Sequence, residues 1–224
     1  MIIHRAWEGT CFCVLMLFAA IVSGQSRLPS QSDNQIWSDV QFSVALNKAV
    51  DFTLLGTLRL GRNVSRPVDE RIGTAFSFKA GKYLTFTPSY LHIGMQPFKG
   101  RKIFENRLTF ATIVRFPVGH FTVSDRNLFE RRLRHPGGDS TRYRNKLQIE
   151  HPVGPPEMKL ALYVANEEFY DWSFNAWVRN RFTFGVNKVF NKHMTQDLYY
   201  LRQNDGHTVP GDINVVGTAL RFKF

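Results

Sequence analysis

The chain has 224 residues, of which 43% are hydrophobic and 14% aromatic, and its formal net charge is +11. Beyond residue 24 no stretch approaches the roughly 18 consecutive apolar residues of a membrane-spanning helix, which excludes a helical membrane protein. The mean hydropathy is slightly negative. That value fits a soluble protein, and it fits equally well a chain of membrane strands in which only every second residue faces lipid.

Residues 1–24 have the organisation of a signal peptide. A weakly basic start, His4-Arg5, precedes an apolar run over residues 11–22, and Val22-Ser23-Gly24 provides small residues for cleavage. Both cysteines of the chain lie inside this segment. The mature chain is therefore expected to have no disulfide, no thiolate metal site and no cysteine nucleophile.

The mature chain consists mainly of segments in which bulky apolar residues occupy alternate positions. Residues 25–35 form a polar N-terminal segment without such a period, and eleven alternating segments follow. A two-residue period indicates β-strands with one apolar face, and lengths of about 10–13 residues suit tilted strands that cross a membrane. The segments are 36–46, 50–60, 69–79, 83–95, 103–116, 121–134, 141–153, 157–169, 177–186, 193–202 and 214–224.

The last segment shows the pattern most clearly. Its bulky residues are Val216, Leu220, Phe222 and Phe224, and small or polar residues lie between them. Chain ends are usually disordered and polar. An aromatic terminus therefore indicates a strand that is paired within a sheet and whose apolar face meets lipid.

These features predict an all-β fold, a closed antiparallel transmembrane β-barrel over residues 36–224. Because bacterial single-chain barrels have even strand numbers, eleven segments predict about twelve strands, with residues 25–35 supplying a poorly patterned strand. The alternative is ten, with one segment outside the wall. Connections after the first, third, fifth and seventh segments are short and most others are longer. Since periplasmic turns are the short ones, odd-numbered strands are expected to run inward and Phe224 to end at the periplasmic face.

Several short polar motifs accompany the strand pattern. They are Gln35-Ile36-Trp37, Ser124-Asp125-Arg126-Asn127, Glu130-Arg131-Arg132, Arg142-Tyr143-Arg144-Asn145-Lys146, Glu168-Phe169-Tyr170-Asp171 and Arg179-Asn180-Arg181. With these motifs and its aromatic end, the chain resembles an uncharacterised family of Gram-negative outer-membrane proteins, domain of unknown function 2490. The resemblance implies export to the bacterial outer membrane and contact with outer-membrane lipids and lipopolysaccharide. It implies no activity, because the family has none established.

The terminal strand also resembles an assembly signal. Leu220, Phe222 and Phe224 match the aromatic ends of outer-membrane proteins, which the barrel-assembly machinery reads during biogenesis. One departure is Ala219, which stands where that signal often has glycine.

Charged residues gather where the predicted strands reach the outer mouth of the lumen. This predicted cluster consists of Arg59, Arg71, Glu105, Arg107, Glu130, Arg132, Arg142, Arg144, Glu167, Arg179 and Arg181. An arginine-rich mouth favours anions, and bidentate guanidinium groups also suit the phosphates of lipopolysaccharide. The structural alternative is that arginine and glutamate ladders fill a narrow lumen, as side chains do in small barrels.

The sequence shows no catalytic constellation. Outer-membrane lipid hydrolases place His and Ser two residues apart on one strand face, and neither His92, His120 nor His151 has Ser at that offset. Glu167 and Glu168 are adjacent, so their side chains point to opposite faces of a strand. Nucleic-acid binding is not expected, since the aromatic residues lie on the face opposite the basic ones. No enzyme activity, cofactor or metal is therefore predicted.

Four functional hypotheses follow. The first is a narrow anion-favouring pore with an arginine-rich outer mouth. The second is a structural or lipopolysaccharide-interacting barrel with a filled lumen. The third is an outer-membrane lipid hydrolase whose catalytic group is not recognised, and the fourth is a secreted β-sandwich that binds polyanions. The oligomeric state stays open.

Overall fold

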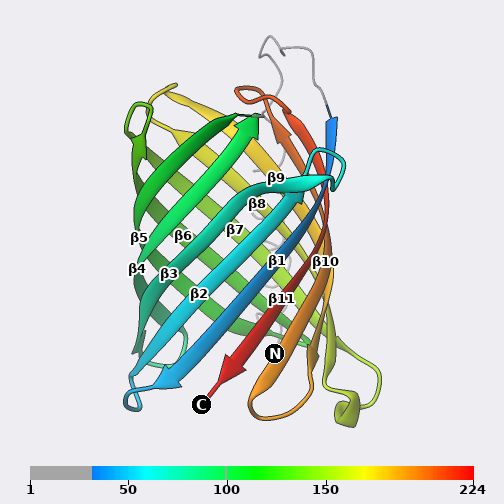
Figure 1. The fold of residues 1–224 in the computed structure, drawn as a ribbon. Coiled ribbons are helices and arrows are strands. Elements are labelled where there is room, and N and C mark those ends of the chain that lie inside the picture. Colours follow the sequence, from blue (N-terminus) through cyan, green and yellow to red (C-terminus); the bar gives the residue numbers. More distant parts are fainter. Residues whose placement is uncertain (1–31, 99) are drawn as a thin grey trace, which may run out of the picture.

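The computed structural model describes residues 32–98 and 100–224, which form a barrel of eleven strands (Figure 1). The closed all-β prediction is confirmed. Among the described residues, no helix is long and apolar enough to cross a membrane. The strands are β1 (Ser32–Ala45), β2 (Val50–Gly61), β3 (Arg66–Ala80), β4 (Leu84–Phe98), β5 (Arg101–Val118), β6 (Phe121–His135), β7 (Ser140–Val153), β8 (Leu160–Asp171), β9 (Ala176–Val189), β10 (Met194–Asp205) and β11 (Asp212–Lys223), with a short 3-10 helix η1 (Pro156–Met158) before β8.

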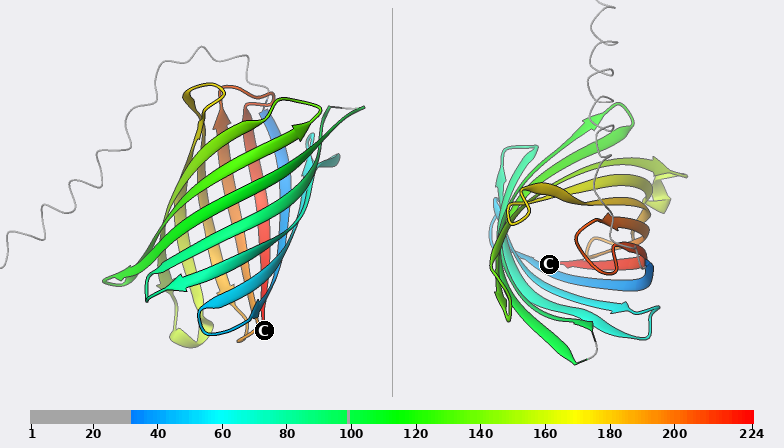
Figure 2. Two further views of the ribbon diagram at one scale, coloured as in Figure 1. Left: turned by 90° about the vertical axis from the view of Figure 1, so that its left-hand side faces the viewer. Right: turned by 90° about the horizontal axis from the view of Figure 1, so that it is seen from above.

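The barrel closes through one parallel pair of strands. All other neighbours are antiparallel, whereas β1 pairs with β11 in the same direction, from Ser32 beside Asp212 to Ser43 beside Lys223. Figure 2 shows the two strands side by side when the barrel is viewed from above. The expectation of twelve or ten strands assumed antiparallel closure, which requires an even number. A parallel seam allows an odd number, so the eleven described strands close without a further one.

The N-terminal boundary also differs from the prediction. The first strand begins at Ser32, so the last four residues of the segment 25–35 belong to the wall. They pair with β11 although they lack apolar alternation, because backbone groups supply the hydrogen bonds of a ladder. The expected signal peptide, residues 1–24, lies outside the described residues.

The terminal strand is paired to its end. The backbone N–H of Phe224 donates to the carbonyl of Ser43 (2.9 Å), and the carbonyl of Phe224 accepts from the N–H of Ala45 (3.1 Å). On the outer surface the rings of Phe42 and Phe222 stack across the seam with their centroids 5.0 Å apart. The aromatic end of the chain therefore holds the first and last strands together.

The connections do not show the predicted difference in length. No connection between described strands exceeds six residues, at either end of the barrel. About half of the expected loop 61–68 and most of the expected loop 96–102 are strand, because β3 begins at Arg66, β4 extends to Phe98 and β5 begins at Arg101. These segments are polar and lack apolar alternation, so the sequence did not predict that the strands extend into them. We call the two ends the Ser32 end, where β1 begins, and the Phe224 end.

Candidate functional site

Alternation divides each polar motif between the two faces of the wall. In the motif around Arg142 and Arg144, both arginines point into the lumen, whereas Tyr143 and Asn145 point outward. The same holds along β6, where Glu130 is buried and Phe129 is half exposed. The motifs thus contribute to two different surfaces, one inside the barrel and one outside.

Three glutamates form the centre of the inner surface. Glu105 and Glu130 have exposed fractions of 0% and 1%, and Glu167 is also buried. Arg107 donates to both Glu105 (2.5 Å) and Glu130 (3.3 Å), and Arg144 links Glu130 (2.7 Å) to Glu167 (2.6 Å). The three carboxylates are thereby joined into one network.

Four further arginines complete this ionic network. Arg132 donates to Glu105 (2.8 Å) and Arg142 to Glu130 (2.6 Å), while Arg126 (2.6 Å) and Arg181 (3.7 Å) contact Glu167. Buried charges are costly unless they are paired and hydrogen-bonded. Each glutamate here has at least two guanidinium partners, so the network satisfies its carboxylates while retaining a surplus of positive charge.

Aromatic rings fill the space between the guanidinium groups. Phe169 is completely buried, and four guanidinium groups lie within 5.4 Å of its ring centroid. Arg59 lies 3.7 Å above the ring of Trp37, with Arg181 at 5.0 Å. Cations are attracted to aromatic faces, most strongly where water is excluded. These rings therefore separate like charges and hold them in place.

Tyrosines fill the lumen nearer the Phe224 end. Tyr163 and Tyr199 point inward, and their rings lie over Gly185 and Gly217 on neighbouring strands. A side chain at either glycine would overlap the facing ring. The two glycines are thus the positions that allow large aromatic side chains to lie across the lumen.

Two cavities lie on either side of this filling. One of about 420 Å³, which we call the vestibule, opens at the Ser32 end, and the other, of about 490 Å³, is lined by Arg115, Glu150 and Arg221 towards the Phe224 end. No described residue lines both cavities. The ionic network and the tyrosines lie between them and divide the lumen.

The vestibule is strongly basic. Its lining includes the aspartates Asp69, Asp171 and Asp205 and the arginines Arg59, Arg71, Arg107, Arg132, Arg134, Arg142, Arg144, Arg179 and Arg181. Two of the aspartates are paired, Asp69 with Arg71 (2.6 Å) and Asp205 with Arg179 (2.5 Å). Three buried nitrogens of the lining, Nε of Arg59, Nε of Arg134 and Nε2 of His207, have no hydrogen-bond partner among the described residues. The vestibule therefore offers positive charge to an anion, together with two N–H donors without a partner, Nε of Arg59 and Nε of Arg134.

The structure places the whole predicted cluster on the lumen side. Eight of its eleven members belong to the ionic network, which extends into the lumen and forms no ring around an open mouth. The other three lie apart from it, since Arg59 and Arg71 contact Asp69 and Arg179 contacts Asp205. Sequence reasoning missed Trp37, Asp69, Arg126, Arg134 and Phe169. The alternation contained a signal for Phe169, which shares its strand face with Glu167, but an aromatic residue was expected to face lipid.

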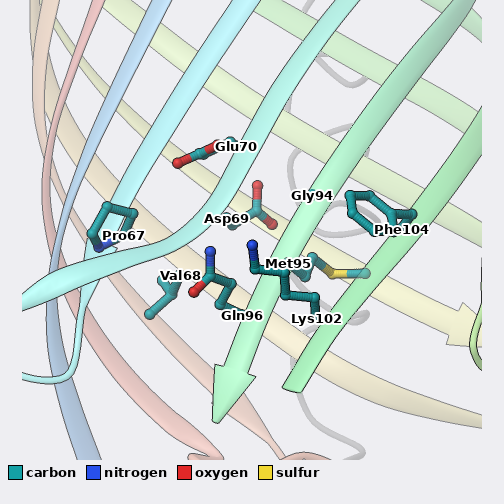
Figure 3. Close-up of a pocket in the computed structure, with 9 residues that line it drawn as sticks. All are labelled: Pro67, Val68, Asp69, Glu70, Gly94, Met95, Gln96, Lys102 and Phe104. Atoms are coloured by element: carbon teal, nitrogen blue, oxygen red, sulfur yellow. The ribbon is translucent and has the colours of Figure 1, made fainter. Parts of the chain in front are cut away.

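A third, smaller pocket lies in the wall. It has a volume of about 110 Å³ and is lined by residues of β3, β4 and β5, among them Asp69, Met95 and Phe104 (Figure 3). It forms where the pairing of β3 with β4 ends at Asp69 and Met95. Ligand pockets usually measure roughly 300–1,000 Å³, so this gap is too small for one. Within the described part of the chain, no group of three metal-ligating side chains comes together.

The closed wall with an apolar outer surface and a polar lumen defines an outer-membrane-type β-barrel. The chain belongs to the family described as "Protein of unknown function (DUF2490)", which matches residues 34–214. The predicted family membership is thus confirmed. No curated protein matches the sequence.

Two solved barrels are similar in fold. LpxR from Salmonella typhimurium is 9% identical with a TM-score of 0.52, over 82% of this chain and 87% of LpxR. An anion-selective porin from Comamonas acidovorans is 12% identical with a TM-score of 0.42, over 81% of this chain and 54% of the porin. The chain therefore spans about half the length of that porin. At such identities the likeness concerns the fold alone.

Proposed function

We propose that this protein is an outer-membrane β-barrel that binds anionic groups in its vestibule and whose lumen is closed by the ionic network. The observation that carries the proposal is the composition of the vestibule, where nine arginines line a cavity with three aspartates. A concave surface of one sign concentrates its field and attracts counter-ions. Guanidinium groups bind phosphates and carboxylates through paired N–H donors.

The proposed orientation places the vestibule outside the cell. It rests on the aromatic terminus, since Leu220, Phe222 and Phe224 have the pattern of an assembly signal and would end at the periplasmic face. The Ser32 end then faces outward. Phosphate groups of lipopolysaccharide are the anions concentrated at that surface, and they are the ligand class we favour. Export by a signal peptide and assembly by the barrel-assembly machinery belong to this proposal.

A narrow anion-favouring pore is the second candidate. It is supported by the two cavities, which lie at opposite ends of the lumen with side chains between them. Conduction would require the ionic network to open. Because three buried glutamates each hold at least two arginines, such an opening would leave buried charges without partners. A closed lumen is therefore the better-supported hypothesis.

Binding and conduction distinguish the two candidates. Titration calorimetry with inorganic pyrophosphate should show binding to the purified protein in detergent. Arg134 lines the vestibule and makes no ion pair with a described residue, so Arg134→Gln should weaken binding about tenfold without disturbing the network. The matched control is Arg115→Gln, which lies at the other cavity and should leave the affinity within about twofold.

Planar-bilayer recordings complete the test. The proposal predicts no steady channel steps from the purified protein. Channels that prefer anions would favour the second candidate, and channels that prefer cations would contradict both. Equal pyrophosphate affinities of the parent protein, Arg134→Gln and Arg115→Gln would show that the vestibule is not the binding site.

A further inference from the structure

The outward halves of the polar motifs form a surface that the lumen does not explain. Strand register places Asn127 of β6 beside Asn145 of β7, Asn145 beside Glu168 of β8, and Glu168 beside Asn180 of β9. Asp125 and Asn166 lie one register row nearer the Phe224 end. We call these six residues the polar belt. It crosses four strands on the outside of the barrel.

The rows on either side of the polar belt are apolar or aromatic. Towards the Ser32 end the next row is Phe129, Tyr143, Tyr170 and Trp177, in register from β6 to β9. Beyond Asp125 and Asn166, towards the Phe224 end, the row is Val123, Ile149, Val164 and Phe184. The aromatic row of a membrane barrel marks the interface, and the apolar rows mark the hydrocarbon. The polar belt therefore lies on the hydrocarbon side of the aromatic row.

Polar groups at such a position are costly. Charged and amide groups on a lipid-facing surface lose water and are tolerated where they have partners. The belt satisfies part of its own requirement, since Asn127 and Asn145 donate to Asp125 (2.8 and 2.7 Å), and Asn166 and Asn180 donate to Glu168 (both 3.2 Å). No described lysine or arginine forms an ion pair with either carboxylate. Two negative charges thus remain without a cation.

The open hydrogen-bonding groups of the belt are acceptors. Oε2 of Glu168 and the amide oxygens Oδ1 of Asn145 and Asn180 accept no hydrogen bond from a described residue. An occupant that fits must supply N–H or O–H donors, and the two carboxylates favour one with a positive charge. The aromatic row beside the belt favours the same charge, because the faces of Tyr and Trp attract cations.

We propose that the polar belt binds the primary-ammonium group of a membrane-lipid headgroup. The ammonium N–H groups would fill the open acceptors of Glu168, Asn145 and Asn180, and the acyl chains would follow the apolar row of Val123 and Ile149 towards the Phe224 end. This site is independent of the vestibule, since the wall separates the two. A lipid phosphate alone is a poor ligand because the carboxylates repel it. A second copy of the belt would bring two more negative charges to the same place.

Lipid competition tests this proposal directly. The purified protein is exchanged into nanodiscs of equal parts phosphatidylethanolamine, phosphatidylcholine and phosphatidylglycerol, and the lipids retained on the barrel are counted by native mass spectrometry. Phosphatidylethanolamine should be enriched about tenfold over phosphatidylcholine, whose quaternary ammonium cannot donate a hydrogen bond. The double variant Asp125→Asn/Glu168→Gln should lose this enrichment, because it removes both charges while keeping side-chain size.

A matched control uses Glu70 of β3, which is exposed and lies outside β6–β9. The Glu70→Gln variant should retain the enrichment, and so should Arg134→Gln, which separates this site from the vestibule. Equal retention of the three lipids, enrichment of phosphatidylglycerol, or an unchanged double variant would overturn the proposal.

A photoreactive amino acid in place of Asn166 extends the test to whole cells. Cross-links to lipid support the proposal, and cross-links to a protein would replace it with a protein interface.

Discussion

Two parts of the barrel wall have the same β-strand backbone but differ in where their charged side chains lie. The seam wall, formed by β11, β1 and β2, has no charged residue on its outer face between Ile36 and Leu60, or on β11 between Val216 and Phe222. The charged wall, formed by β6–β9, carries most of the ionic network inside and the polar belt outside, while Glu105 and Arg107 of the network come from β5. Because burying charge is costly, its concentration on both faces of the charged wall supports the two proposed binding sites. The seam wall contributes Trp37 and Arg59 to the vestibule from its inner face, and its outer face supports closure.

The largest effect should come from the terminus of the seam wall. Deletion of Phe224 removes the two backbone hydrogen bonds to Ser43 and Ala45 and the last ring of the proposed assembly signal. We expect most of the protein to be lost from the outer-membrane fraction. Quantitative immunoblotting of fractionated cells measures this, with Phe190→Ala in a turn at the same end as control. Full recovery of the truncated protein would show that closure does not depend on the terminus.

The next effect should appear in the charged wall. Glu130→Gln leaves Arg107, Arg142 and Arg144 with a neutral partner, and breaking a buried ion pair costs about 3–5 kcal/mol of the free energy of unfolding. The seam-wall counterpart is Ser43→Ala, which removes a hydrogen bond of 2.9 Å to Thr53 and should cost about 1 kcal/mol. Urea unfolding in lipid vesicles compares the two. Similar losses would mean that the network adds nothing beyond ordinary polar pairs.

These two walls were not equally predictable from the sequence. Alternation assigned Phe42, Leu54 and Phe222 to the outer face of the seam wall, because a two-residue period determines which face each side chain takes. It did not predict parallel closure, which arises because the first and last of eleven alternating strands run in the same direction. In the charged wall alternation placed the arginines inside. It could not say which arginine meets which glutamate, since long side chains bridge strands that are not neighbours, as Arg126 of β6 does to Glu167 of β8.

The sequence contained one sign of the outer polar belt, since the segment 121–134 has charged residues on both of its predicted faces. Asp125 and Asn127 interrupt the apolar face there, and Asn145, Glu168 and Asn180 do so in three later motifs. Only the register shows that four of these five residues, Asn127, Asn145, Glu168 and Asn180, form one row. Register depends on the turns of three successive hairpins, and an error of one residue in any of them would move the row to the other face.

A smaller effect on stability is expected when one glycine in each wall is replaced by alanine. A side chain at Gly185 of β9 would overlap the ring of Tyr163, whereas Gly56 of β2 has open space around it. Overpacking costs about 1–3 kcal/mol, so Gly185→Ala should destabilise the barrel by that amount and Gly56→Ala should not. The same urea titration measures both. If Gly185→Ala unfolds like the parent protein, Tyr163 moves aside and the lumen is less tightly filled than its geometry indicates.

The smallest effect is expected at the rim of the charged wall. Arg131 and Asp139 form an ion pair of 3.2 Å, but about half of each side chain is exposed, 51% and 45%. Water and salt screen such a pair, so Asp139→Asn should change the free energy of unfolding by less than about 1 kcal/mol. The buried pair of Arg142 and Glu130 has the same chemistry. Asp139→Asn and Glu130→Gln could instead lower the free energy of unfolding by the same amount. Burial would then not explain why the stability of the charged wall depends on its charges, and the two walls would differ in composition alone.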